Sequence, residues 1–456
     1  MVSSAPVPII SSRPLGIGEW FWWQMSKARS VNFVTLTRLS GHVDAARIQQ
    51  AIAYVQQRYP ILRSRIVSTG SRPQLEVLTH VHVPFLAVAR QSAVQHMQLA
   101  QQEISDSIPA DNCPLWRVHL VHGETQSELL LTFHHCMSDG LSSVQIMQDM
   151  LLFHAGQHST EPEQIGIPLA YDDLLPKSSL WQTMRHYWPA IRRLIKPPAL
   201  AQLQQRPAAT SATLPHQADA TASPIEAYSQ ALVHEFSAEQ TKQLLANCKK
   251  MGGTINDMLS GALLKAAAPE LTGEQEQLVS MTSAINVRPL LPPSYHQAVG
   301  YYSSGIESRF LLSTNSDPLT LGKQATQMAK SQFNVLNIQF GLWLRSVLIR
   351  FRPNPTDLLS TLMKGSRANI HLSNMGRADL NRQFGDVTVD ALIPMAGVHY
   401  AHKPLFCMVT VTFDQRLTLI AAFCQPMTGI DHAQQMFDRY CTLIDQWSAS
   451  PIAQSA

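Results

Sequence analysis

Charged residues are scarce in this sequence. Only 15% of its 456 residues are Asp, Glu, Lys or Arg, and the formal net charge is +3, whereas an average soluble protein has about 25% charged residues. No long run of lysine or arginine occurs. Proteins that bind a phosphate backbone carry clustered basic side chains. We therefore expect no nucleic-acid partner.

Cysteine is also scarce, and no C-x-x-C pair occurs. The cysteines stand far apart, at positions 113, 136, 248, 407, 424 and 441. Disulfide frameworks and zinc sites need cysteines at closer and more regular spacings. The spacing favours reduced, unligated thiols in a cytosolic protein, with no metal site.

Long apolar runs are absent as well. No stretch reaches the roughly 18 uninterrupted apolar residues of a membrane-spanning helix, and residues 1–6 lack the basic start and apolar core of a signal peptide. We expect a cytoplasmic protein. Residues 180–196 and 340–351 combine aromatic and basic side chains, a composition that suits the surface of a membrane. Helices packed on the protein explain both segments more simply, and peripheral membrane contact stays as the alternative.

Apolar residues are present in ample number, since hydrophobic residues make up 45% of the chain. A chain of 456 residues exceeds what one core usually supports, so two lobes are expected. Residues 197–227 are rich in Ala, Ser, Thr, Pro and Gln, and this composition cannot bury enough surface to offset its ordering entropy. We predict a first lobe over residues 1–196, a linker over 197–227 and a second lobe over 228–456.

The segment that organises the chain is His-His-Cys-Met-Ser-Asp-Gly at residues 134–140. The apolar run at 128–133 predicts a strand before it, and the helical spacing at 141–151 predicts a helix after it. A loop at the end of a strand holds a side chain rigidly and leaves it accessible. An imidazole with a reference pKa of about 6.5 accepts protons near neutral pH. By chance the full pattern should arise about once in a thousand chains of this length.

The pattern His-His-x-x-x-Asp-Gly resembles the signature of a superfamily of acyltransferases. Its members include chloramphenicol acetyltransferase, condensation domains of non-ribosomal peptide synthetases, plant BAHD acyltransferases, wax ester synthases and mycobacterial polyketide-associated acyltransferases. Stand-alone, condensation-domain-like acyltransferases are the most similar. Other segments match the superfamily in order, namely 58–63, where Tyr59 replaces the usual histidine, 254–259, 285–290 and 373–376.

The resemblance implies an α/β protein. Its fold would consist of two chloramphenicol-acetyltransferase-like α/β sandwich lobes with an active-site tunnel at their interface. A tunnel between lobes suits acyl transfer, because donor and acceptor enter from opposite faces while bulk water is largely excluded from the reacting carbonyl.

The resemblance also implies roles for the motif residues. His135 would be the general base, which takes a proton from the acceptor as it attacks a thioester and passes that proton to the leaving thiolate. His134 would brace the loop, and Asp139 would pair with Arg288. The alternative is that Arg288 lies on the surface and that Asp139 only caps the following helix. Cys136 as a nucleophile is a further, less favoured alternative.

The remaining site residues concern the developing oxyanion and the tunnel wall. Backbone N–H groups around Gly140 could meet the oxyanion at the start of the helix. Ser373 and Asn374 belong to a segment similar to one that lines the tunnel in the superfamily, so they could serve instead. On the residues alone, these two side chains could equally well stabilise a turn.

The function that the resemblance implies is transfer of an acyl group to the hydroxyl of a hydrophobic acceptor. The co-substrate would be an acyl-CoA or acyl-carrier-protein thioester, with no cofactor bound. The expected partners are a small-molecule alcohol or amine and, for a carrier-bound donor, an acyl carrier protein. Two alternatives stay open, namely an amide-forming stand-alone condensation enzyme and a catalytically silent scaffolding homologue.

Overall fold

The structure is a computed structural model. It describes residues 11–68, 70–158, 166–178, 182, 185, 187–188, 227–272, 276–365, 368–398 and 406–449. The predicted linker at 197–227 lies outside the described residues except for Ala227, and so does most of the aromatic and basic segment at 180–196. No described helix is both long enough and apolar enough to cross a membrane.

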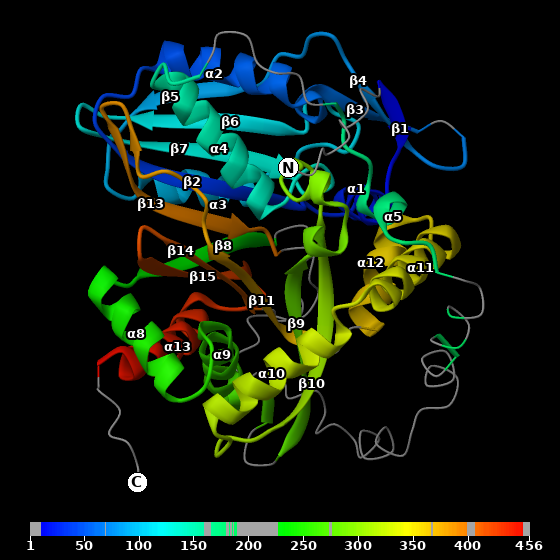
Figure 1. The fold of residues 1–456 in the computed structure, drawn as a ribbon, viewed down its shortest axis with the longest axis vertical. Coiled ribbons are helices and arrows are strands. Elements are labelled where there is room, and N and C mark those ends of the chain that lie inside the picture. Colours follow the sequence, from blue (N-terminus) through cyan, green and yellow to red (C-terminus); the bar gives the residue numbers. More distant parts are fainter. Residues whose placement is uncertain are drawn as a thin grey trace.

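The first of two large sheets is built mainly from the N-terminal part of the chain. Its strand order is β12 (Gln383–Phe384), β13 (Val387–Ala396), β2 (Asn32–Ser40), β7 (Gln126–His134), β6 (Trp116–His122) and β5 (Phe85–Ala89). All neighbours are antiparallel except β5 and β6. Helices α2 (Ala45–Arg58) and α4 (Gly140–His154) pack against each other over this sheet, and α3 (Gln95–Ser105) contacts β2 (Figure 1).

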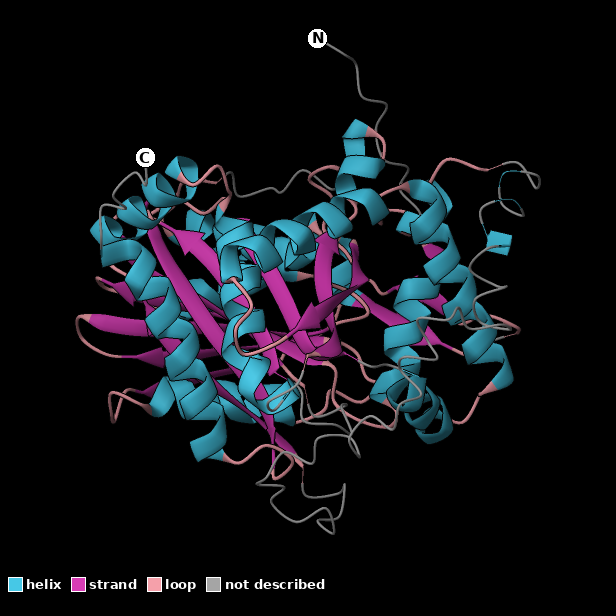
Figure 2. Ribbon diagram, turned by 90° about the horizontal axis from the view of Figure 1, so that it is seen from below, coloured by secondary structure: helices cyan, strands magenta, loops and turns pink. Residues whose placement is uncertain are grey.

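The second sheet holds the C-terminal strands. Its order is β10 (Ser303–Leu312), β9 (Gln277–Asn286), β11 (Ala368–Arg377), β14 (Phe406–Phe413), β15 (Arg416–Gln425) and β8 (Tyr228–Glu235). The helices α8 (Ala238–Lys250), α9 (Ile255–Thr272), α10 (Pro318–Gln332) and α13 (Ile430–Ala449) pack against this sheet (Figure 1). Figure 2 shows helices lying against the strands in the view from below. The architecture is therefore α/β with two large sheets, which confirms the predicted fold class.

Smaller elements complete the first half and the junction. A short sheet joins β1 (Ser12–Pro14), β4 (Gln74–Val77) and β3 (Ser64–Val67), and the short helices are η1 (Pro60–Arg63), α5 (Tyr171–Leu174), η3 (Arg288–Leu290) and η4 (Pro293–Tyr295). Helix α1 (Ile17–Ser26) contacts α11 (Val335–Phe351) and α12 (Pro355–Gly365), which Figure 1 shows side by side. Helices from both halves thus meet beside the junction of the sheets.

The predicted division of the chain at residue 228 assigns strand β13 to the second lobe, but in the structure β13 joins the first sheet. Residues 387–396 pair with β2 of the first sheet and also contact β14 and β15 of the second. Their consecutive apolar side chains are buried at 391–395. Such a run needs cover on both faces, and the position between the two halves provides it. The second half of the chain therefore completes the first sheet.

Local sequence features explain two element boundaries in the first half. Asp44 caps α2, since its carboxylate accepts a hydrogen bond of 2.8 Å from the N–H of Ala46. The apolar run at 61–66 favours a strand, but Pro60–Arg63 forms a 3-10 turn before β3. Proline favours the first helical position, because its fixed φ suits a helix and its nitrogen has no hydrogen to leave unpaired.

Helices α9 and α10 approach each other through two glycines. A Cβ atom added to Gly322 would lie 1.8 Å from the carbonyl oxygen of Asp257, and one added to Gly261 would lie 1.8 Å from that of Pro318. We expect Gly322→Ala to lower the free energy of unfolding by about 1–3 kcal/mol or more, because backbone must move to admit the methyl group. Urea unfolding followed by circular dichroism measures this change.

Gly341 in α11 is the matched control for that substitution. A Cβ atom there has no neighbour within 4 Å, so Gly341→Ala should stabilise the protein by up to about 1 kcal/mol through helix propensity. Equal effects of the two substitutions would contradict the close packing of α9 on α10.

Candidate active site

The loop between β7 and α4 carries the motif at the junction of the two halves. Strand β7 ends at His134, and α4 begins at Gly140. Asp139 has extended backbone angles and accepts a hydrogen bond of 2.9 Å from the N–H of Ser142, so it caps the helix. The partly buried ring of His135 faces a cavity of about 670 Å³, whose walls come from both halves.

One ring nitrogen of His135 is fixed by the loop itself. Nδ1 lies 3.0 Å from the carbonyl oxygen of Ser138. A carbonyl only accepts hydrogen bonds, so Nδ1 must carry the hydrogen and Nε2 of the neutral ring has the lone pair. Among the described residues, Nε2 has no hydrogen-bond partner. The loop therefore presents a basic nitrogen that a ligand in the cavity can engage.

Aromatic side chains from three segments surround the His135 ring. Trp22 stacks on it with centroids 4.7 Å apart, Phe33 is tilted at 5.1 Å, and Tyr301 meets it edge-on at 5.5 Å. Burial among these groups lowers the pKa of His135 below 6.5, while the Ser138 carbonyl and the Asp139 carboxylate oppose the shift. The ring is therefore neutral at neutral pH and ready to accept a proton.

His134 occupies a different environment from its neighbour. Its side chain is fully buried, and its Nδ1 accepts a hydrogen bond of 3.1 Å from the N–H of Cys136. Burial, helped by the nearby His135, lowers the pKa of His134 to about 3. Cys136 is also buried, and burial raises the pKa of its thiol. His134 thus holds the loop as a neutral ring, and Cys136 is a poor source of thiolate.

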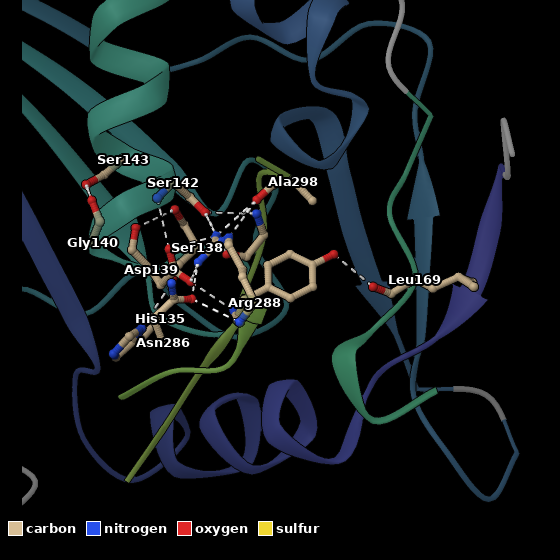
Figure 3. Close-up of polar contacts among 12 residues, drawn as sticks. His135, Ser138, Asp139, Gly140, Ser142, Ser143, Leu169, Asn286, Arg288 and Ala298 are labelled. Carbon is tan, nitrogen blue, oxygen red and sulfur yellow. Dashed lines mark hydrogen bonds and ion pairs between the residues drawn. The ribbon is translucent and has the colours of Figure 1, made fainter. Parts of the chain in front are cut away.

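Asp139 and Arg288 form a buried ion pair between elements 149 residues apart in sequence. Nη1 and Nη2 of Arg288 donate to the two carboxylate oxygens at 2.9 and 3.2 Å, and each residue is 4% exposed. The N–H of Tyr302 donates to the same carboxylate at 2.9 Å. Burial alone would raise the pKa of Asp139, but Arg288 and these hydrogen bonds hold it below its usual value. The predicted pair is therefore present (Figure 3).

Further hydrogen bonds tie Arg288 and α4 together. Nη2 of Arg288 donates to the hydroxyl of Ser142 at 2.8 Å and to the carbonyl of Ala298 at 3.0 Å. The Ser142 hydroxyl donates in turn to the carbonyl of Gly300 at 2.8 Å. The guanidinium nitrogens of Arg288 all donate to oxygen atoms held by the fold, so this network ties the motif loop to the second half of the chain (Figure 3).

The segment around Ser373 and Asn374 lines the cavity from strand β11, but the two side chains differ. The Asn374 amide donates to Asn256 at 3.1 Å, and its oxygen accepts from the N–H of Gly376 at 2.9 Å and from the hydroxyl of Thr410 at 3.1 Å. Ser373 has no hydrogen-bond partner among the described residues. Ser373 is thus the one of the two whose hydroxyl is available to a ligand.

Gly140 also lines the cavity, opposite Met375 of β11. A Cβ atom added to Gly140 would lie 2.9 Å from the terminal methyl carbon of Met375. That methyl group is the end of a flexible side chain, so an alanine at 140 would displace it at small cost. The glycine therefore sets the shape of the cavity more than the stability of the fold.

Four residues of the cavity wall were not predicted as site residues from the sequence. They are Trp22, Tyr301, His371 and Arg345. Three tryptophans at 20–23 predict burial against the core, with lining of an acyl channel as the alternative; Trp20 and Trp23 are buried, whereas Trp22 stacks on His135. Burial, together with the nearby His135, lowers the pKa of His371 to about 4. The sequence signal for Trp22 is its place in the tryptophan cluster, and that for Tyr301 is its place shortly after the segment 285–290.

Comparison with known proteins identifies the family. Residues 15–339 match the family model described as "Condensation domain". The chain belongs to the condensation domain family. Among the curated relatives, polyketide synthase PksN of Bacillus subtilis is 27% identical to this chain over 164 residues, which are 35% of the chain. Tyrocidine synthase 2 of Brevibacillus parabrevis is also 27% identical over 164 residues, which are 33% of the chain.

These relatives are much longer proteins. The matches span only 3% of PksN and 4% of tyrocidine synthase 2. Matches of this extent show similarity to one domain of each synthase. They do not transfer the reactions of the whole synthases to this chain.

Solved structures show the same fold over nearly the whole chain. A trichothecene 15-O-acetyltransferase of Fusarium sporotrichioides superposes with a TM-score of 0.69 at 10% identity, covering 96% of this chain and 95% of that one. Polyketide synthase associated protein 5 of Mycobacterium tuberculosis superposes with a TM-score of 0.62 at 13% identity, covering 97% and 99%. The fold is thus that of the condensation and chloramphenicol-acetyltransferase-like acyltransferases, with two lobes, as the motif resemblance implied.

Proposed function

We propose that this protein is a thioester-dependent O-acyltransferase with His135 as its general base. The observation that supports this most directly is the orientation of His135. Its Nδ1 is held by the Ser138 carbonyl, so the lone pair of Nε2 is free inside a cavity shared by both halves. A fixed, neutral imidazole in such a cavity is what deprotonation of a bound nucleophile requires.

The reaction balances without any further reagent. The acceptor oxygen attacks the thioester carbonyl, and Nε2 of His135 takes the hydroxyl proton. The tetrahedral intermediate then breaks its carbon–sulfur bond, and the imidazolium returns the proton to the leaving sulfur. The products are an ester and a free thiol. No acyl-enzyme is needed, because the thioester is already activated.

Two features of the site support the charge changes of this reaction. The negative charge on the carbonyl oxygen can be met by the hydroxyl of Ser373 and by N–H groups in the first turn of α4, near Gly140. The Asp139 carboxylate adjoins the His135 loop and favours the imidazolium form. The amide oxygen of Asn374 already accepts two hydrogen bonds and its nitrogen donates one, so Asn374 mainly holds the wall in place.

The donor is a thioester of coenzyme A or of an acyl carrier protein, and the acceptor is a small molecule with a mainly apolar body. Apolar side chains such as Phe21, Leu344 and Leu348 make up much of the cavity wall and match such a body. Formation of an amide from an amine acceptor is the second candidate, because the curated matches include peptide synthases such as tyrocidine synthase 2.

Thiol release tests the proposal. The protein is incubated with a panel of acyl-CoA thioesters and with alcohols or amines of matched carbon skeleton, and free thiol is followed with a dye. We expect release that depends on the acceptor and is faster with alcohols, with the ester identified by mass spectrometry. Faster release with amines would favour the condensation alternative. No acceptor-dependent release with any donor, free or carrier-bound, would favour the silent scaffold.

A further inference from the structure

One of the four charged side chains on the cavity wall has no partner of opposite charge among the described residues. Those that line it are Asp139, Arg288, Glu307 and Arg345. Asp139 and Arg288 neutralise each other, and the exposed Glu307 binds Arg309 at 3.2 Å. Arg345 has neither an ion pair nor a hydrogen bond among the described residues. The cavity therefore carries one unmatched positive charge.

Arg345 projects from α11 into an aromatic part of the wall. Its guanidinium carbon lies 5.3 Å from the centroid of the Phe21 ring, and its neighbours one helical turn either side on the wall are Gly341 and Leu348. The side chain is partly buried. A guanidinium that is drawn out of water without a counterion binds an anion more strongly than an exposed one does, and its planar fork fits a carboxylate.

Arg345 lines the same cavity as His135 and is linked to it through two aromatic rings. The Phe21 ring that it covers lies 5.6 Å from Trp22, and Trp22 stacks on His135 at 4.7 Å. Tyr301, in edge-on contact with His135, is near enough for the charge of Arg345 to act on its pKa, although burial keeps that pKa raised.

We infer that Arg345 binds a carboxylate of the substrate, so that the substrate is an apolar molecule with one acidic group near the reacting atoms. This inference rests on the proposed acyl transfer and specifies the substrate class for the same cavity. The carboxylate belongs either to the acceptor, as in a hydroxy acid, or to the acyl chain, as in a dicarboxylic thioester. Without Arg345 an apolar cavity would reject a carboxylate in favour of an uncharged alcohol.

Binding of decanoate and decanol to the full chain, measured by isothermal titration calorimetry, tests the inference without turnover. We expect the wild type to bind decanoate at least about tenfold more tightly than decanol, the size of one hydrogen bond to a charged group. Arg345→Met should remove this preference and keep decanol binding, which shows that the cavity is intact. Arg350→Met, at an exposed position of the same helix, should keep the preference.

A second titration assigns the carboxylate to one of the two substrates. The protein is first saturated with S-octyl-CoA, a thioether that cannot transfer its chain. If decanoate still binds with the Arg345-dependent preference, the carboxylate belongs to the acceptor, and if the two ligands compete, it belongs to the acyl chain. The inference fails if the wild type does not prefer decanoate or if Arg345→Met keeps the preference. Such a failure would not contradict the proposed acyl transfer, which the thiol-release assay tests separately.

Discussion

We expect replacement of His135 by alanine to lower the acceptor-dependent rate of thiol release by about a hundred- to ten-thousand-fold, the range typical of general base catalysis. The substitution removes the nitrogen that accepts the proton and leaves the loop contacts of His134 in place. The loss should therefore fall on kcat, with KM for the thioester changed much less. Initial rates over a range of donor and acceptor concentrations measure both constants.

His122 at the end of β6 is the matched control, because it is exposed on the same sheet and does not line the cavity. His122→Ala should turn over like the wild type. Thermal unfolding of both variants separates a chemical loss from a folding loss. If His135→Ala kept more than about a tenth of the wild-type rate while folded, another group would have to be the base.

We expect Arg288→Ala to lower the free energy of unfolding by about 3–5 kcal/mol, because it leaves the Asp139 carboxylate buried without its counterion. The variant also removes the hydrogen bond to Ser142 and so loosens the start of α4. Activity should fall with stability, since the His135 loop ends at Asp139. Urea unfolding at neutral pH measures the change.

The exposed pair Arg65 and Glu76 is the control for that prediction. Its members are 3.0 Å apart, with Arg65 49% exposed, so Arg65→Ala should change the free energy of unfolding by less than about 1 kcal/mol. A similar small loss for Arg288→Ala would show that the buried pair does not hold the two halves together.

The pH dependence of stability follows from the lowered pKa of Asp139. A carboxyl group whose pKa is lower in the folded than in the unfolded state stabilises the fold above its unfolded pKa, and this contribution is lost as the pH falls through the folded value. The difference in stability between the wild type and Arg288→Ala should therefore be full at neutral pH and should shrink in acid. A difference that is constant down to strongly acidic pH would assign it to packing instead of charge.

The sequence predicted the parts of the site that local pattern and motif can define. The short apolar run before His134 favours a strand, and the helical spacing after Gly140 favours a helix. Asp139 and Arg288 are 149 residues apart, and no periodicity links them. Their pairing was predicted through resemblance and through the cost of burying a lone carboxylate.

The rest of the site depends on how the halves pack. Trp22, His371 and Arg345 come from a helix, a strand and another helix, and each lies in a stretch whose composition is ordinary for a core. Only the packing of α1, α11 and β11 around the motif loop turns these side chains toward one cavity. Strand β13 is similar, since nothing in its apolar run tells which sheet it will join.

The measurement that tests the central claim most directly is the pH dependence of kcat/KM with an alcohol acceptor. Burial lowers the pKa of His135 below 6.5, and the base acts only when unprotonated. We predict that log kcat/KM rises with a slope of one in acid and becomes level from a point below 6.5 through neutral and alkaline pH. A rate that continued to rise tenfold per pH unit through neutrality would mean that hydroxide, and not His135, removes the proton.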